Sequence, residues 1–241
     1  MKSLVLCVLI LLLSQSTFAD PDDSVFTTYS ENGSRQLDFK LGSTSQANQP
    51  HQSAAIIGLG YALTDRWFGE LYLGYVRAGS DPIAFDSAAL QNTFVLTDGT
   101  TPLDIGLFTE VEYEQDRSAG YQLTFGPLLQ TEFGLTKVNF NFLFKRDYLA
   151  DFSNPLQLGY QWQIKHRWNL PLEFGMQGFG ELGQWDHWAP QSGQSHRLGP
   201  AIFGKLALGD QQMIHYNAAI LFDVFDGQRA TTFRAQIIYG F

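Results

Sequence analysis

Thr231-Thr232-Phe233-Arg234-Ala235-Gln236-Ile237-Ile238-Tyr239-Gly240-Phe241 forms the C-terminal segment of the chain, and its pattern indicates the architecture. In an extended strand, one face of this segment carries Phe233, Ala235, Ile237, Tyr239 and Phe241. The other face carries Thr232, Arg234, Gln236 and Gly240. A strand needs this alternation when lipid lies on one side and a polar interior on the other. The segment therefore predicts one strand of a transmembrane β-barrel.

The same segment resembles the C-terminal signature of bacterial outer-membrane β-barrels, in which apolar residues at every second position precede a terminal Phe. In that class the signature is read by the barrel-insertion machinery. The resemblance implies that machinery as a partner through Phe241, with outer-membrane lipid as the surroundings. A second segment, Phe174–Gly183 followed by Gly199-Pro200, is similar to segments of transporter-like outer-membrane families. No functional residue is carried over from this resemblance.

The other end of the chain indicates export. A short positive start at Met1 and Lys2 precedes the apolar run Leu4–Leu13, and Ser14–Ala19 offers a small-residue cleavage site. This is the plan of a secretory signal peptide, and the run is too short to span a membrane as a helix. The expected domains are a signal peptide over 1–19, a loose periplasmic lead-in over 20–34, and an outer-membrane barrel over 35–241.

Composition narrows the possible chemistry. The only cysteine, Cys7, lies in the expected leader, so disulfides and thiol chemistry are excluded for the mature chain. A net charge of −9 argues against nucleic acid as a partner, because phosphate binding needs clustered Lys and Arg. The 15% aromatic content and 23 glycines are typical of a barrel with aromatic girdles and closely approaching strands.

Most of the chain after Gln36 alternates with a period of two, as Pro155–Arg167 shows most clearly. Eleven segments alternate clearly, but barrels of this kind have even strand numbers, so one more strand is required. We expect this strand at Leu90–Thr97, because the turn signal Asp98-Gly99 follows it. The fold class is all-β: an antiparallel, up-and-down transmembrane β-barrel of about 12 strands, with about 10 as the alternative. The clear segments are 36–43, 54–63, 66–78, 102–114, 119–133, 137–147, 155–167, 170–183, 197–208, 213–224 and 230–241.

The same trace predicts which connections share a side of the membrane. Counting back from Phe241, the short turns at 134–136, 168–169 and 209–212 fall on the periplasmic side. The loops at 114–118, 148–154, 184–196 and 225–229 then fall outside.

The inward faces of these strands collect charges of both signs. A mixed lumen of this kind is either a water-filled pore, in which charges set selectivity, or a narrow interior filled by paired side chains. The inward charges are Asp38, Lys40, Glu70, Asp104, Glu110, Glu112, Glu114, Lys145, Lys165, Arg167, Glu173, Glu181, Lys205, His215, Asp223 and Arg234. The candidate selectivity residues among them are Glu110, Glu112, Lys145, Lys165, Arg167, Glu173 and Glu181.

Three carboxylates share one strand face at Glu110, Glu112 and Glu114. They repel one another unless cations lie nearby, so they could attract a cationic solute or hold a divalent metal. The alternatives are neutralisation by Lys145, Lys165 and Arg167 on later strands, or exposure of Glu114 to external solvent. We favour these alternatives, and we predict no metal site.

The loop 184–196 contains Asp186, His187, Ser192, Ser195 and His196, the residue types of a hydrolase triad or a metal site. Spacing in a loop supplies no catalytic geometry, however, and no Ser and His pair shares an outward strand face. We therefore expect no catalytic residues and no cofactor. The expected function is a narrow pore or binding conduit for a small solute. The alternative is a non-conducting envelope scaffold, and a lipid-modifying enzyme ranks third.

Overall fold

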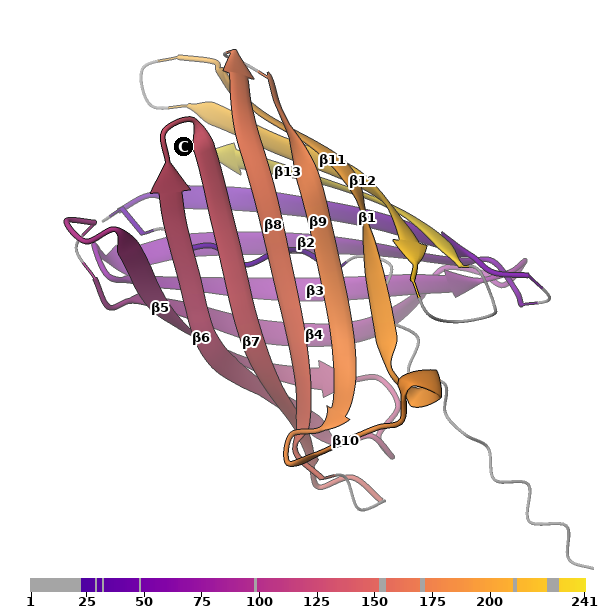
Figure 1. Cartoon of the computed structure of the whole chain (residues 1–241). Helices are drawn as coiled ribbons and strands as arrows, with labels where there is room; N and C mark the ends of the chain where they lie inside the picture. The colour runs from indigo at the N-terminus through magenta and orange to yellow at the C-terminus, as the bar shows by residue number, and fades with distance from the viewer. Residues whose placement is uncertain are drawn as a thin grey trace, which may run out of the picture.

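The computed structural model describes residues 23–241, with the exception of 29, 32, 48, 98, 152–154, 170–171, 210–211 and 225–229. The expected signal peptide and Asp98 lie outside the described residues. The chain forms a closed antiparallel β-barrel (Figure 1). Among the described residues, no helix is long and apolar enough to cross a membrane.

Twelve long strands make the ring, which confirms the predicted number. Each long strand pairs with the next long strand along the chain, so that β8 pairs with β9 and β9 with β11. The pairing of β1 with β13 closes the ring. The short β10 pairs only with the end of β9. The strands are β1 (Arg35–Ser45), β2 (Gln52–Thr64), β3 (Trp67–Ala78), β4 (Ala84–Val95), β5 (Leu103–Glu114), β6 (Tyr121–Phe133), β7 (Thr136–Tyr148), β8 (Gln157–Asn169), β9 (Leu172–Gln184), β10 (His187–Trp188), β11 (Ser195–Ala207), β12 (Met213–Asp223) and β13 (Thr231–Gly240).

The C-terminal strand has the two faces that its sequence predicts. On the outer face Phe233 and Ile237 are 49% and 50% exposed, whereas on the inner face Thr232 and Arg234 are each 1% exposed. The same contrast recurs around the ring, so the outer surface is an apolar belt of the kind that lipid covers.

The predicted twelfth strand exists, but it begins earlier than expected. It is β4 (Ala84–Val95), and the turn that follows contains Gly99 with φ +75°, a conformation that favours glycine. The expected range, 90–97, covers only its second half. The Ala and Ser residues at the start of β4 weaken the alternation there, and the register with β3 shifts between Gly74 and Tyr75.

Both ends of the barrel sequence lie at one rim, which we call the terminal rim. The backbone N–H of Arg35 donates to the carbonyl of Phe241 at 3.3 Å, and the N–H of Phe241 donates to the carbonyl of Arg35 at 3.0 Å. Because the strands alternate in direction, the turns after β2, β4, β6, β8 and β11 share this rim. The other connections form the opposite rim, the loop rim. This division agrees with the predicted grouping of turns and loops.

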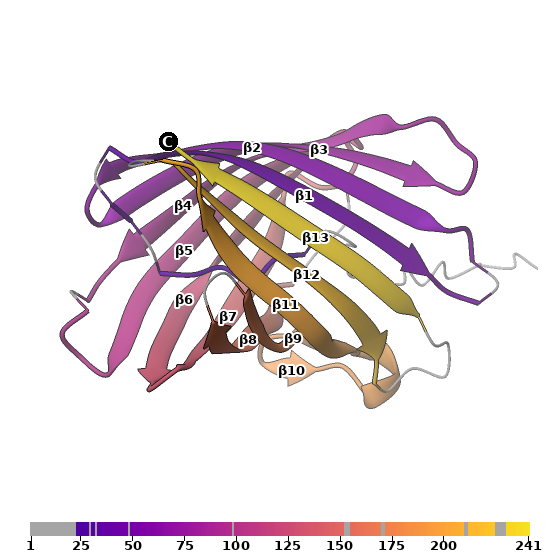
Figure 2. The same ribbon diagram turned by 90° about the horizontal axis from the view of Figure 1, so that it is seen from above.

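Residues 23–28 lie inside the barrel. Seen from above, the indigo trace of this segment crosses the space that the strands enclose (Figure 2). The sequence predicts a loose periplasmic lead-in over 20–34, whereas residues 23–28 of that range contact inward side chains of the strands. We call residues 23–28 the crossbar.

Candidate functional site

The crossbar is held at its centre by Phe26. The ring of Phe26 stacks on that of Phe108 of β5, with centroids 3.9 Å apart and an interplanar angle of 16°. The backbone N–H of Phe26 donates to Gln161 Oε1 at 2.5 Å, and its carbonyl accepts from Asn141 Nδ2 at 2.9 Å. Both amide side chains are buried, so strands β7 and β8 satisfy the backbone of a segment that has no strand partner of its own.

Two further contacts fix the crossbar on the other side of the lumen. Val25 packs against an apolar cluster of β9, β11 and β12, and Asp23 forms an ion pair with Arg197 of β11 at 2.6 Å. The Arg197 side chain is 4% exposed, so its charge is withdrawn from solvent and needs the carboxylate. The cluster against Val25 consists of Phe179, Ala201, Phe203, Ala219 and Leu221.

The crossbar lines cavities of very different sizes. On the terminal-rim side lies a cavity of about 530 Å³, which we call the vestibule; its wall includes residues 24–28 of the crossbar and the β6–β7 turn at Gly134 and Leu135. The second pocket, bordered by Asp23, Lys145 and Glu181, holds only about 20 Å³. The vestibule thus reaches the terminal rim, and the pocket that borders Asp23 is far smaller.

A chain of buried hydrogen bonds runs around the wall at the base of the vestibule, and we call it the amide belt. Gln177 Nε2 donates to Gln163 Oε1 at 3.1 Å, and Gln177 Oε1 in turn accepts from Arg234. Gln236 Nε2 donates to Asp38 Oδ2 at 2.8 Å, as does the Tyr72 hydroxyl. In the order of its hydrogen bonds, the belt consists of Gln130, Asn139, Gln163, Gln177, Arg234, Asn217, Gln236, Asp38 and Tyr72.

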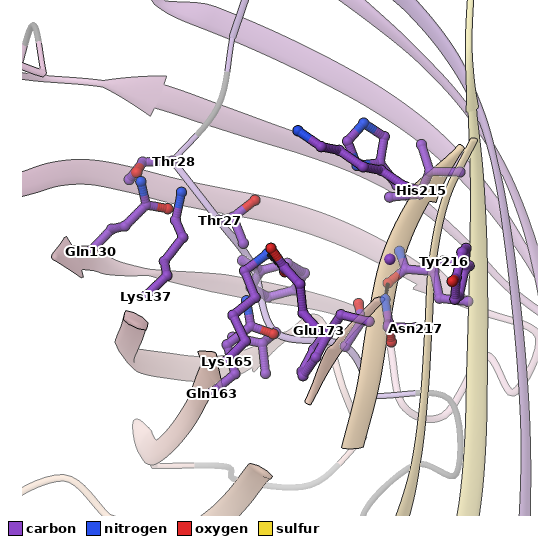
Figure 3. Close-up of a pocket in the computed structure, with 18 of the residues that line it drawn as sticks. Thr27, Thr28, Gln130, Lys137, Gln163, Lys165, Glu173, His215, Tyr216 and Asn217 are labelled. Carbon is purple, nitrogen blue, oxygen red and sulfur yellow. Dashed lines mark hydrogen bonds and ion pairs between the residues drawn. The ribbon is translucent and has the colours of Figure 1, made fainter. Parts of the chain in front are cut away.

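Three of the predicted selectivity residues meet in the vestibule. Glu173 Oε2 lies 3.5 Å from Lys165 Nζ, and Glu173 Oε1 lies 3.4 Å from Arg167 Nε. Figure 3 shows Lys165, Glu173 and His215 beside the cavity, with Thr27 of the crossbar next to the same space. This group lies near the terminal rim, on strands β8, β9 and β12.

The other predicted selectivity residues lie elsewhere. Lys145 Nζ forms an ion pair with Glu181 Oε1 at 2.9 Å beside the small pocket. Glu110 accepts a hydrogen bond from Gln91 of the adjacent strand, and Glu112 lies two residues further toward the loop rim on the same face of β5. The structure therefore divides the predicted set between the two sides of the crossbar. Their role in selectivity stays a prediction.

Lys145 lies near enough to Glu110 and Glu112 of the three-carboxylate ladder on β5 to act on them electrostatically, while the closest ion pairs of the three basic residues lie elsewhere. Lys165 and Arg167 pair with Glu173, and Lys145 pairs with Glu181, so these ion pairs lead to β9 and not to β5. In the described part of the chain, no group of three or more His, Asp, Glu or Cys side chains has an arrangement that could hold a metal ion.

The loop between β9 and β11 does not assemble its Ser, Asp and His residues into a triad. His196 is hydrogen-bonded through Nδ1 to the Tyr160 hydroxyl at 2.7 Å and through Nε2 to Gln194 at 2.9 Å. Trp185 and Trp188 are more than half exposed, in keeping with an aromatic girdle at the loop rim.

Sequence reasoning missed the crossbar and the amide belt. The belt residues could have been found from their inward positions, since Asn139 and Gln163 fall on the polar face of clearly alternating strands. Nothing in the five residues Ser24–Thr28 signals a place in the lumen. Their partners are supplied by strands far away in the chain.

Comparison with known proteins shows which solved structures have a similar architecture. No protein-family model and no curated protein matches the sequence. The COG4313 outer-membrane channel from Pseudomonas putida F1 matches with a TM-score of 0.63 and 12% identity over 93% of this chain and 100% of that one. The NanC porin matches with a TM-score of 0.60 and 9% identity over 83% and 98%. The KdgM porin in complex with disordered oligogalacturonate matches with a TM-score of 0.57 and 8% identity over 86% and 99%.

At these identities the likeness concerns the fold. The chain has the fold of small outer-membrane channel and porin barrels, which confirms the class that its sequence resembles.

Proposed function

We propose that the protein is a narrow outer-membrane channel for a small solute and that the crossbar closes it at rest. The observation that carries this proposal is the vestibule of about 530 Å³, which reaches the terminal rim and has residues 24–28 in its wall. A cavity of this size suits a small organic solute. The named channels and porins among the structural neighbours support a pore over an enzyme.

The crossbar is suited to act as the gate because it precedes β1 and can be withdrawn from the lumen without moving a strand. The contacts described above are a ring stack, the packing of Val25 against an apolar cluster, two backbone hydrogen bonds and one ion pair, and none of them is a strand ladder. Such a segment can leave the lumen without unpairing the barrel. Export through a cleaved signal peptide and residence in the outer membrane belong to this proposal, with the terminal rim facing the periplasm.

The test is the conductance of the refolded mature chain in a planar bilayer, compared with a variant that lacks residues 20–28. We expect rare, brief openings from the intact chain and a steadily open pore from the deletion variant. Circular dichroism of both proteins establishes that they are folded before recording. Silence from the folded deletion variant would overturn the channel.

A second candidate function is a non-conducting scaffold of the cell envelope. The observation that favours it is the filled centre of the lumen. The crossbar joins two apolar clusters there, and the amide belt links the side chains of the wall. A scaffold predicts silence from both proteins, together with a partner that co-purifies with the intact barrel. The bilayer experiment therefore separates the two functions.

A further inference from the structure

One wall of the vestibule carries the basic residues Lys205 and His215, which form no ion pair with a carboxylate in the described part of the chain. Lys205 of β11 and His215 of β12 are directly opposite in the strand register, and both line the cavity. Lys165 and Glu173 both lie close enough to His215 to act on it electrostatically. Among the described residues, no ion pair joins Lys205 or His215 to a carboxylate, whereas Lys165 and Arg167 share Glu173. Lys165, Arg167 and Lys205 together carry more positive charge than the single carboxylate of Glu173 balances, and His215 adds an imidazole that can donate a hydrogen bond.

Apolar side chains surround these cations. Phe203 precedes Lys205 by two residues on the same face of β11, and the Lys165 ammonium lies 5.6 Å from the centre of its ring. Met213 precedes His215 by two residues on β12, and Ile238 of β13 is the register partner of His215. Phe203, Met213 and Ile238 all line the vestibule. The wall thus places apolar side chains on both sides of its basic pair along the strands.

The vestibule carboxylates of β1 and β3 are already engaged. Asp38 accepts from Tyr72 and from Gln236, each at 2.8 Å, and lies 3.9 Å from Lys40. Glu70 accepts from Gln36 at 2.5 Å. A cationic solute would have to compete with these partners, whereas an anionic solute meets Lys205 and His215 without displacing a carboxylate.

We propose that the vestibule binds a small organic anion with an apolar body, its acid group held at Lys205 and His215 and its body lying over Phe203, Met213 and Ile238. This inference rests on the proposed function, since it names the solute class of that channel. Hydrogen bonds from charged donors strengthen in a cavity partly shielded from water. The apolar body adds burial of hydrophobic surface.

The test uses methionine methyl groups as reporters. The chain contains 3 methionines, and the mature chain would keep Met213 in the vestibule and Met176 on the outer face of β9. Carbon-13 methyl spectra of the refolded mature chain in a non-ionic detergent are recorded while cyclohexanecarboxylate is added. Cyclohexylmethanol and cyclohexylmethylamine serve as the neutral and cationic counterparts of the same shape. Met176 reports on partition of each probe into the detergent.

We expect the Met213 signal to shift with cyclohexanecarboxylate while the Met176 signal stays in place. The alcohol and the amine should need at least about tenfold higher concentrations for the same shift, which corresponds to one ion-paired hydrogen bond. Lys205→Gln and His215→Gln should each weaken carboxylate binding about tenfold. Lys145→Gln removes a positive charge beside the small pocket and should leave the titration unchanged.

Equal binding of the three probes, or a Met213 signal that does not move, would overturn this inference. Because the titration needs no conduction, its outcome is separate from that of the bilayer experiment. A conducting protein with no Met213 shift refutes the anion site alone. A silent protein with a selective Met213 shift keeps the site and refutes the channel.

Discussion

The ring of Phe26 stacks on the ring of Phe108 at a centroid distance of 3.9 Å, so a residue that precedes the first strand lies against the middle of β5. Phe108 is 1% exposed and packs with Leu128 and Leu143, so the stack extends an apolar cluster inside the lumen. The interior of this barrel is therefore organised around a segment that is not part of its wall.

Phe26→Ala should loosen the crossbar and lengthen the open periods of the pore. Truncating a buried Phe costs about 3 to 5 kcal/mol in protein cores, and the partly buried Phe26 should fall near or below the lower value. Single-channel dwell times measure the effect. Thr27→Ala is the matched control, because it shortens a neighbouring crossbar side chain without touching the ring stack. Equal dwell times in the two variants would contradict a role for Phe26 in closure.

Asp23→Asn should weaken the same closure through charge. The substitution leaves the guanidinium of Arg197 without its crossbar carboxylate, at a cost of about 1 to 2 kcal/mol after allowance for the partial exposure of Asp23. The wild-type open probability should rise with salt concentration, since ions screen the pair, and the variant should lose most of that dependence. A variant that keeps the full salt dependence would show that another pair is responsible.

Gln177→Leu should destabilise the barrel without opening it. Gln177 is 1% exposed, donates to Gln163 and accepts from Arg234, so the change removes both hydrogen bonds from buried groups. Each buried polar group left without a partner costs about 1 to 3 kcal/mol. Urea unfolding followed by tryptophan fluorescence measures the loss. Met176→Leu, next along β9 but facing outward, should change the midpoint little.

Glu110→Gln together with Glu112→Gln should shift the ion preference of the open pore toward anions. Both carboxylates belong to the inward face of β5, and their removal takes two negative charges from the lumen wall. The reversal potential across a salt gradient, recorded with the crossbar deleted, measures the shift. An unchanged reversal potential would exclude these residues from selectivity.

The wall of the barrel could be predicted from sequence because each strand shows the alternation of inward and outward residues within its own sequence. Inward Asn139 and Asn141 are 1% and 0% exposed, as the alternation of β7 requires. A period of two depends only on near neighbours along the chain.

The contents of the lumen could not be predicted in the same way. The hydrogen bond between Phe26 and Gln161 joins residues 135 positions apart, and no local pattern encodes such a contact. Likewise, Lys145 lies on the inward face as predicted, but its ion pair with Glu181 of β9, 36 positions away, depends on which side chains the curvature of the wall brings together.

The reciprocal backbone bonds between Arg35 and Phe241 have a consequence for the order of assembly. Ring closure joins β1 to β13, the contact of greatest sequence separation among the strands, so its loop-closure entropy is the largest. Until that seam forms, an otherwise complete sheet exposes two unpaired edges that can recruit other chains. Slow closure should therefore make the open sheet the species most prone to aggregation, and the time spent in that state should limit the yield of folded protein.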